Sequence, residues 1–242
     1  MSLMTPVELC CAPAWYSSLA AHTFPASFLA LRTEEVAALR DGRTEGEEVD
    51  AVLRRLAPPM RSFPGNCFVF TDLTAPTDTE RFEDKRGAVY SPESAWRYLV
   101  ASAKVRHAAA VGQVGHLCIR PFRRMNRTRE FRLFLYQGKL RGMSQYWLIR
   151  HYRRLEGRKD FFWKSAIRFV DEISWLLPHP TIVMDVYFTA ENQILIVDFN
   201  PWGPPTDPLL LRSWERAWDE EDVGIKLIPP PVSVNGELNV SF

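Results

Sequence analysis

Two neighbouring apolar segments near the C-terminus, residues 181–188 (TIVMDVYF) and 193–199 (QILIVDF), each contain a single aspartate. Short runs of β-branched and aromatic residues separated by a polar turn predict the two strands of a β-hairpin. Asp185 and Asp198 are then surrounded by apolar side chains, where an unpaired carboxylate is costly and tends to take up a proton. The fold must therefore supply a partner for each carboxylate.

The position of the turn decides whether the two aspartates meet. If Glu191 and Asn192 are its two central residues, Asp185 lies directly opposite Asp198, and Asn200 shares the face of Asp198. Like charges across a ladder destabilise a sheet, and a divalent cation removes that repulsion. Since all three donors are hard oxygens, Mg²⁺ or Mn²⁺ is favoured over Zn²⁺.

A competing interpretation needs no metal. Asp198 can cap the loop that follows it, and Asp185 can pair with an arginine. A turn one residue longer would place the two aspartates on opposite faces of the hairpin and remove the argument for a metal.

The rest of the chain predicts an α+β fold with mostly antiparallel strands, because short turns join several neighbouring strands. Its 242 residues suit one large domain or two small ones. Helices are predicted over residues 33–41, 46–57, 92–110, 159–177 and 208–218, and strands over residues 67–71, 114–120, 130–136, 139–147, 181–188 and 193–199.

The net charge of +1 hides a strong segregation along the chain. Residues 120–168 hold 15 Lys and Arg against three acidic residues, whereas residues 169–242 hold 12 acidic residues against three basic ones. A basic middle beside an acidic end suggests a bound polyanion next to carboxylates that hold a metal. The alternative is that folding mixes these charges into an ordinary surface.

Membrane and secretory features are not expected. No apolar run approaches the roughly 20 residues of a membrane helix, and the first nine residues include Glu8 but no basic residue. The four cysteines match no zinc spacing, and free thiols fit a reducing, cytoplasmic setting.

Several segments resemble the cell division cycle protein 123 family. The segments MDVYF and VDFNPWGPPTDPLLLRSWE are similar to its C-terminal signature. AWYSSLAAHTFPASFLAL, FVFTDLTAPTDT and EFRLFLYQGKLRGMSQYW resemble three further blocks in the same order. The resemblance extends from about residue 11 to residue 218 and implies an ATP-grasp fold. In that fold two α+β subdomains, here residues 1–120 and 121–242, grip ATP between them.

The family motif carried by this chain makes Asp185, Asp198 and Asn200 ligands of Mg²⁺. The resemblance also implies that Arg132 reaches phosphate and that the segment from Arg120 to Phe122 lies near adenine. Two alternatives remain open: Arg132 can form a salt bridge to an aspartate of an adjacent strand, and Phe122 can be an ordinary core residue.

One departure concerns phosphate binding. In the block matched by FVFTDLTAPTDT the family has a lysine and often a second one soon after it, but here those positions are Phe70 and Thr77. Lys85, Arg86 or Lys104 are candidates to replace the missing lysine, and Lys104 is counted among the expected ATP-binding residues.

Three functions remain open. The resemblance implies an ATP- and Mg²⁺-dependent factor that acts on a protein client, as the family assists assembly of translation initiation factor 2 by gripping its gamma subunit. An alternative is a carboxylate–amine ligase that acts through an acyl phosphate. Nucleic-acid binding by residues 120–168 ranks last.

Overall fold

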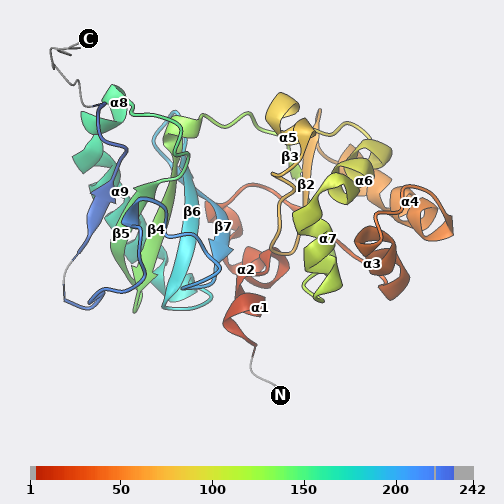
Figure 1. Cartoon of the computed structure of the whole chain (residues 1–242), viewed down its shortest axis with the longest axis horizontal. Coiled ribbons are helices and arrows are strands. Elements are labelled where there is room, and N and C mark those ends of the chain that lie inside the picture. The colour runs from red at the N-terminus through yellow and green to blue at the C-terminus, as the bar shows by residue number, and fades with distance from the viewer. Residues whose placement is uncertain (1–3, 221, 232–242) are drawn as a thin grey trace, which may run out of the picture.

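The computed structural model describes residues 4–220 and 222–231, which fold into two β-sheets with helices on their outer sides (Figure 1). One sheet has three strands and the other has five. Every pair of neighbouring strands is antiparallel except one. The predicted α+β class with mostly antiparallel strands is therefore confirmed.

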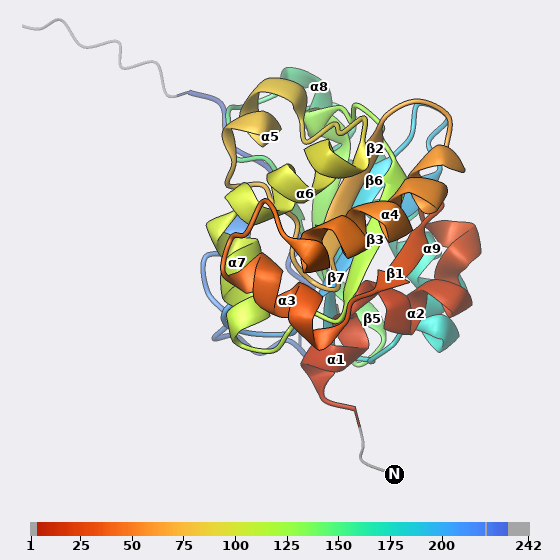
Figure 2. The same cartoon turned by 90° about the vertical axis from the view of Figure 1, so that its right-hand side faces the viewer.

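The smaller sheet has the strand order β1-β3-β2, and helices cover one of its faces (Figure 2). Val69, Leu117 and Ile119 point into this helical side and pack with Trp96, and all four side chains are buried. The strands are β1 (Ser27–Ala30), β2 (Cys67–Thr71) and β3 (His116–Pro121), and the helices are α3 (Thr33–Arg40), α4 (Glu47–Arg61), α6 (Pro92–Ala101) and α7 (Ala103–Ala110). A short helix, α5 (Glu80–Lys85), follows β2.

The larger sheet has the strand order β7-β6-β4-β5-β8, and only β5 and β8 are parallel. One face is apolar and packs against α9, with Phe131, Met184 and Phe199 at its centre. The strands are β4 (Glu130–Tyr136), β5 (Lys139–Gln145), β6 (Ile182–Phe188), β7 (Ile194–Asn200) and β8 (Gly224–Lys226), and the helices are α8 (Arg153–Glu156) and α9 (Lys159–Ile173). The other face carries the polar side chains of the candidate site.

The first two helices, α1 (Pro6–Cys10) and α2 (Ala12–Leu19), precede the smaller sheet in sequence but pack on the larger one. The ring of Trp15 meets the ring of Phe199 edge-on, with their centroids 5.1 Å apart. A division of the chain at residue 120 stays a prediction, and the packing of α1 and α2 crosses it.

The helix predicted over residues 208–218 is wrong, because only Leu209–Leu211 forms a helical turn. Trp214 and Trp218 instead pack around the ring of Phe134, on the face of the larger sheet opposite α9. Burial of two indole rings against a sheet outweighs a local helical pattern.

The helix predicted over residues 92–110 is divided at Ser102 into α6 and α7. The Ser102 hydroxyl accepts a hydrogen bond from the Val105 amide at 3.1 Å and donates one to Asp78 Oδ1 at 2.5 Å. Ser102 therefore caps α7, and a capping serine inside a helical pattern marks a new start. The structure also contains short elements that the periodicity did not predict, namely α1, α2, β1, α5, α8 and β8.

Within the described parts of the chain, no helix is both long and apolar enough to cross a membrane.

Candidate functional site

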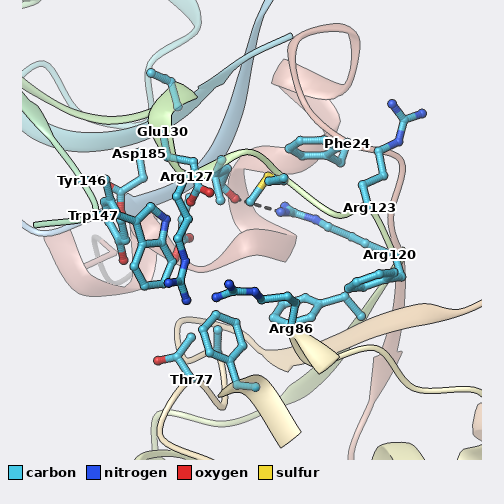
Figure 3. A pocket seen from close by; sticks show the side chains of 18 of the residues that line it. Phe24, Thr77, Arg86, Arg120, Arg123, Arg127, Glu130, Tyr146, Trp147 and Asp185 are labelled. Atoms are coloured by element: carbon cyan, nitrogen blue, oxygen red, sulfur yellow. Dashed lines mark hydrogen bonds between the residues drawn. The ribbon is translucent and has the colours of Figure 1, made fainter. Parts of the chain in front are cut away.

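A cavity of about 340 Å³ opens between the two sheets (Figure 3). Its lining comes from the loop around α5, from β3, from the segment that joins β3 to β4, and from the polar face of the larger sheet. The charged residues that line it are Arg86, Arg120, Arg123, Arg127, Glu130, Asp185 and Asp198. A mostly apolar cavity with a few convergent charged groups is typical of a ligand site.

The β6–β7 hairpin brings Asp185 and Asp198 opposite each other, as the sequence predicts. This register arises differently from the predicted one, because the turn is one residue longer. The Thr189 amide donates to the Gln193 carbonyl at 2.8 Å, and Asn192 adopts φ +65° inside the turn. A β-bulge then adds an extra residue, Val197, on β7, and the two one-residue shifts cancel.

Asp185 is paired with an arginine of the next strand. Arg132 lies opposite Asp185 on β4, and its Nε and Nη2 donate to the two carboxylate oxygens at 2.8 Å each. Arg132 Nη1 donates to the Asp207 carbonyl, also at 2.8 Å. Both partners are buried, and the arrangement is the salt bridge that the sequence left open as an alternative. A contact between Arg132 and phosphate stays a prediction.

Asp198 has no such partner. Its Oδ1 accepts a hydrogen bond from the Phe199 amide at 2.9 Å, and its Oδ2 accepts none among the described residues. Burial raises the pKa of Asp198 to about 8, and the nearby Asp185 adds to the rise, while Arg120 opposes it. A carboxylate that resists ionisation in this way is stabilised by any cation that reaches it.

The donor set fits a hard divalent cation. Asn200 Nδ2 donates to Asp185 Oδ2 at 3.1 Å, which leaves the Asn200 amide oxygen without a donor among the described residues. In the described ranges no three Asp, Glu, His or Cys side chains are placed so that they could hold a metal ion, so a metal here requires this amide oxygen beside Asp198 and Asp185. One lone pair on Asp185 Oδ1 also remains for a metal, beyond its bond to Arg132.

Arg120 joins the smaller sheet to the larger one. From β3, its Nη1 donates to the carbonyl of Val197, the extra residue of the bulge, at 2.8 Å. Its guanidinium carbon lies 4.8 Å from the ring centroid of Phe70 on β2. The side chain is buried, and burial lowers its pKa, whereas Asp198 favours its charge.

The other two predicted ATP contacts occupy different places. Phe122 lines the cavity and is partly buried, so it is not a fully enclosed core residue. Lys104 is exposed and is not part of the lining. Its Nζ donates at 3.1 Å to the hydroxyl of Thr77, which does line the cavity.

Sequence reasoning missed Glu130 and Trp147, which the β4–β5 hairpin brings into the cavity. Burial raises the pKa of Glu130 to about 7. The Trp147 ring stacks on Phe82 of α5 with centroids 6.1 Å apart, and the Arg127 guanidinium carbon lies 4.3 Å from its centroid. The two-residue period of β4, which places Glu130 on the same face as Arg132, was the signal that could have found Glu130.

Comparisons with known proteins show which family this chain belongs to. A family model described as D123 matches residues 60–229. The translation initiation factor eIF2 assembly protein of Xenopus tropicalis is 36% identical over 98 residues, which cover 39% of this chain and 29% of that protein. A putative CDC123-like protein of Acanthamoeba polyphaga mimivirus is 22% identical over 209 residues, which cover 81% of this chain and 64% of that protein.

The fold is that of a solved Cdc123 structure. C-terminally truncated Cdc123 from Schizosaccharomyces pombe superimposes with a TM-score of 0.79 and 21% sequence identity, covering 95% of this chain and 100% of that one. The chain therefore has the fold of Cdc123, and the ATP-grasp arrangement implied by the resemblance stays a prediction. The segments matched in the eIF2 assembly proteins of Xenopus tropicalis, Xenopus laevis and Danio rerio span less than a third of each of those proteins. By the match over residues 60–229, this chain belongs to the D123 family.

Proposed function

We propose that this chain binds ATP together with Mg²⁺ in the cavity between its two sheets. One observation carries the proposal. Asp185 and Asp198 face each other across the β6–β7 hairpin, within a cavity whose arginines form no ion pair among the described residues. Opposed carboxylates beside unpaired guanidinium groups match a ligand that joins a cation to a polyanion.

The hairpin residues and Arg132 of β4 have different roles in the proposed metal site. Asp198 and Asn200 would each supply an oxygen that accepts no hydrogen bond from the described residues, and Arg132 donates to both carboxylate oxygens of Asp185 and fixes its orientation. Mg²⁺ held there would offset the charge of the facing carboxylates and of the nucleotide phosphates.

We also infer that the nucleotide-bound chain grips a protein client in the assembly of translation initiation factor eIF2, in the cytoplasm. Support comes from membership of the D123 family and from relatives that carry the name eIF2 assembly protein. The gamma subunit is the first client to test.

Calorimetric titration with ATP in the presence of Mg²⁺ tests the nucleotide site. We expect the wild type to bind, and Asp198→Asn to lose at least tenfold in affinity because the negative charge of the carboxylate is gone. Asp222→Asn is the matched control, since Asp222 is exposed and lies beside β8, at the opposite edge of the sheet from β7. Equal affinity of wild type and Asp198→Asn would refute the metal site.

A second titration tests the client. We expect the gamma subunit of eIF2 to bind more tightly when ATP and Mg²⁺ are present, and this gain to disappear in Asp198→Asn. Absence of binding would refute the client and leave the nucleotide site standing. Release of ADP that requires both a carboxylate and an amine substrate would favour the ligase instead.

A further inference from the structure

The cavity contains more positive charge than the protein itself balances. Arg86, Arg120 and Arg127 all line it, and none of them forms an ion pair in the described parts of the chain. In Figure 3, Arg86 and Arg127 extend into the cavity from different parts of the chain, and Arg120 approaches from β3. Of the three carboxylates in the lining, Asp185 already faces Arg132. An anion is therefore the missing partner.

Arg120 is the most constrained of these cations. It is 7% exposed, and the one hydrogen bond that its side chain makes to the described residues runs from Nη1 to the carbonyl of Val197. Its Nε and Nη2 are buried and have no acceptor among the described residues. Unpaired donors of a buried charged group are costly and rare in native proteins, so these two groups indicate a ligand oxygen.

The surroundings of Arg120 show which part of a nucleotide would reach it. Its hydrogen bond to the carbonyl of Val197 holds the guanidinium beside the residue that precedes Asp198. An oxygen bound by Nε and Nη2 would therefore lie close to a metal held by Asp198. Phosphate is the part of ATP that is shared between an arginine fork and a metal.

We propose that Arg120 is a phosphate-binding residue of this chain, held in place by the ring of Phe70, and not a contact to adenine. The lysine expected at position 70 by family resemblance is absent, and the Arg120 guanidinium lies over the phenylalanine that replaces it. A guanidinium stacked on an aromatic face keeps its fork directed at the ligand. This inference rests on the proposed nucleotide site.

The test separates phosphate from adenine by using three probes: ATP, tripolyphosphate and adenosine, each with Mg²⁺. Arg120→Met should weaken ATP and tripolyphosphate by about 10- to 100-fold, the loss of one or two charged hydrogen bonds, and leave adenosine unchanged. Arg124→Met, which removes the same charge from an exposed side chain outside the cavity lining, should leave all three affinities within about twofold. An equal loss for ATP and adenosine, with tripolyphosphate unaffected, would overturn the proposal.

Thermal unfolding shows whether Arg120→Met is folded. Because Arg120 carries unpaired buried donors, its replacement should leave the melting temperature of the ligand-free protein unchanged or raised, and should remove the increase caused by tripolyphosphate. If Arg120→Met does not fold, Phe70→Leu gives the second test. It keeps the guanidinium but removes the ring beneath it, and it should weaken tripolyphosphate several-fold while sparing adenosine. Unchanged tripolyphosphate binding in Phe70→Leu would then overturn the proposal.

The same probes distinguish failure of the proposal for Arg120 from failure of the proposed nucleotide site. A wild type that binds none of the three probes refutes the nucleotide site itself. If the wild type binds tripolyphosphate and Arg120→Met binds it with equal affinity, only the role of Arg120 is refuted.

Discussion

Replacing Arg132 with methionine gives the sharpest test of how the acidic pair is supported. The substitution removes both hydrogen bonds to Asp185 and the hydrogen bond to the Asp207 carbonyl. It leaves Asp185, whose side chain is only 9% exposed, facing Asp198 without a cation between β4 and β6. Removal of one partner of a buried ion pair costs about 3–5 kcal/mol.

For a chain of this size, that loss lowers the melting temperature by about 6–20 °C. Chemical unfolding of the ligand-free protein, followed by circular dichroism, measures the loss of unfolding free energy directly. The double variant Arg132→Met with Asp185→Leu should regain most of the lost stability, because apolar groups of similar volume replace both charges. Arg141→Met serves as control, since Arg141 pairs with the exposed Asp222 and its loss should cost less than about 1 kcal/mol.

The reasoning fails if Arg132→Met is as stable as the control variant but binds ATP much more weakly. Arg132 would then act on phosphate, as the family resemblance implies, and its pairing with Asp185 would contribute little to the fold.

Three further predictions concern separate parts of the molecule. Burial raises the pKa of Glu130 from 4.5 to about 7, so the folded state holds this proton more tightly than the unfolded state does, and the resulting stability is lost as pH rises from about 4.5 to 7. The free energy of unfolding should therefore fall between pH 5 and pH 7, and Glu130→Gln should flatten that fall. An unchanged slope would contradict the assignment. Phe134→Ala should lower the unfolding free energy by about 3–5 kcal/mol, because the ring is fully buried beneath Trp214 and Trp218; a loss under about 1 kcal/mol in urea unfolding would show that the cluster repacks. Lys104→Met should change ATP affinity by less than about twofold, because the exposed amine is not part of the cavity lining and contacts the hydroxyl of Thr77, which is; a tenfold loss in calorimetry would make Lys104 the replacement for the missing lysine.

Hydrophobic periodicity in the sequence was sufficient to predict the longer strands and helices whose apolar residues recur regularly. The apolar runs 181–188 and 193–199 predicted β6 and β7 to within a residue at each end, and the facing of Asp185 and Asp198 followed from strand alternation. The same reasoning was wrong about the turn, and a bulge at Val197 corrected the error. A bulge arises from packing across several strands, so a single hairpin sequence does not reveal it.

The aromatic segment after β7 shows the opposite case. Trp214 and Trp218 lie four residues apart, which is a helical spacing, yet the segment is irregular because both rings pack on Phe134 of a distant strand. Local periodicity cannot weigh such burial, since the surface that receives the rings is formed by residues far away in the sequence.

The sequence by itself therefore determined the α+β class, most of the longer helices and strands, the family resemblance and the opposition of two carboxylates, because these depend on short-range periodicity and on motifs. Only the tertiary structure decided that Arg132 pairs with Asp185, that Arg120 reaches Val197 across two sheets, and that Glu130 and Trp147 share one cavity with Arg120 and Asp185. These contacts join residues 50 or more positions apart or lie in a cavity that neither sheet encloses alone. The order of the strands and the burial of both sheets select them from many pairings that the sequence equally allows.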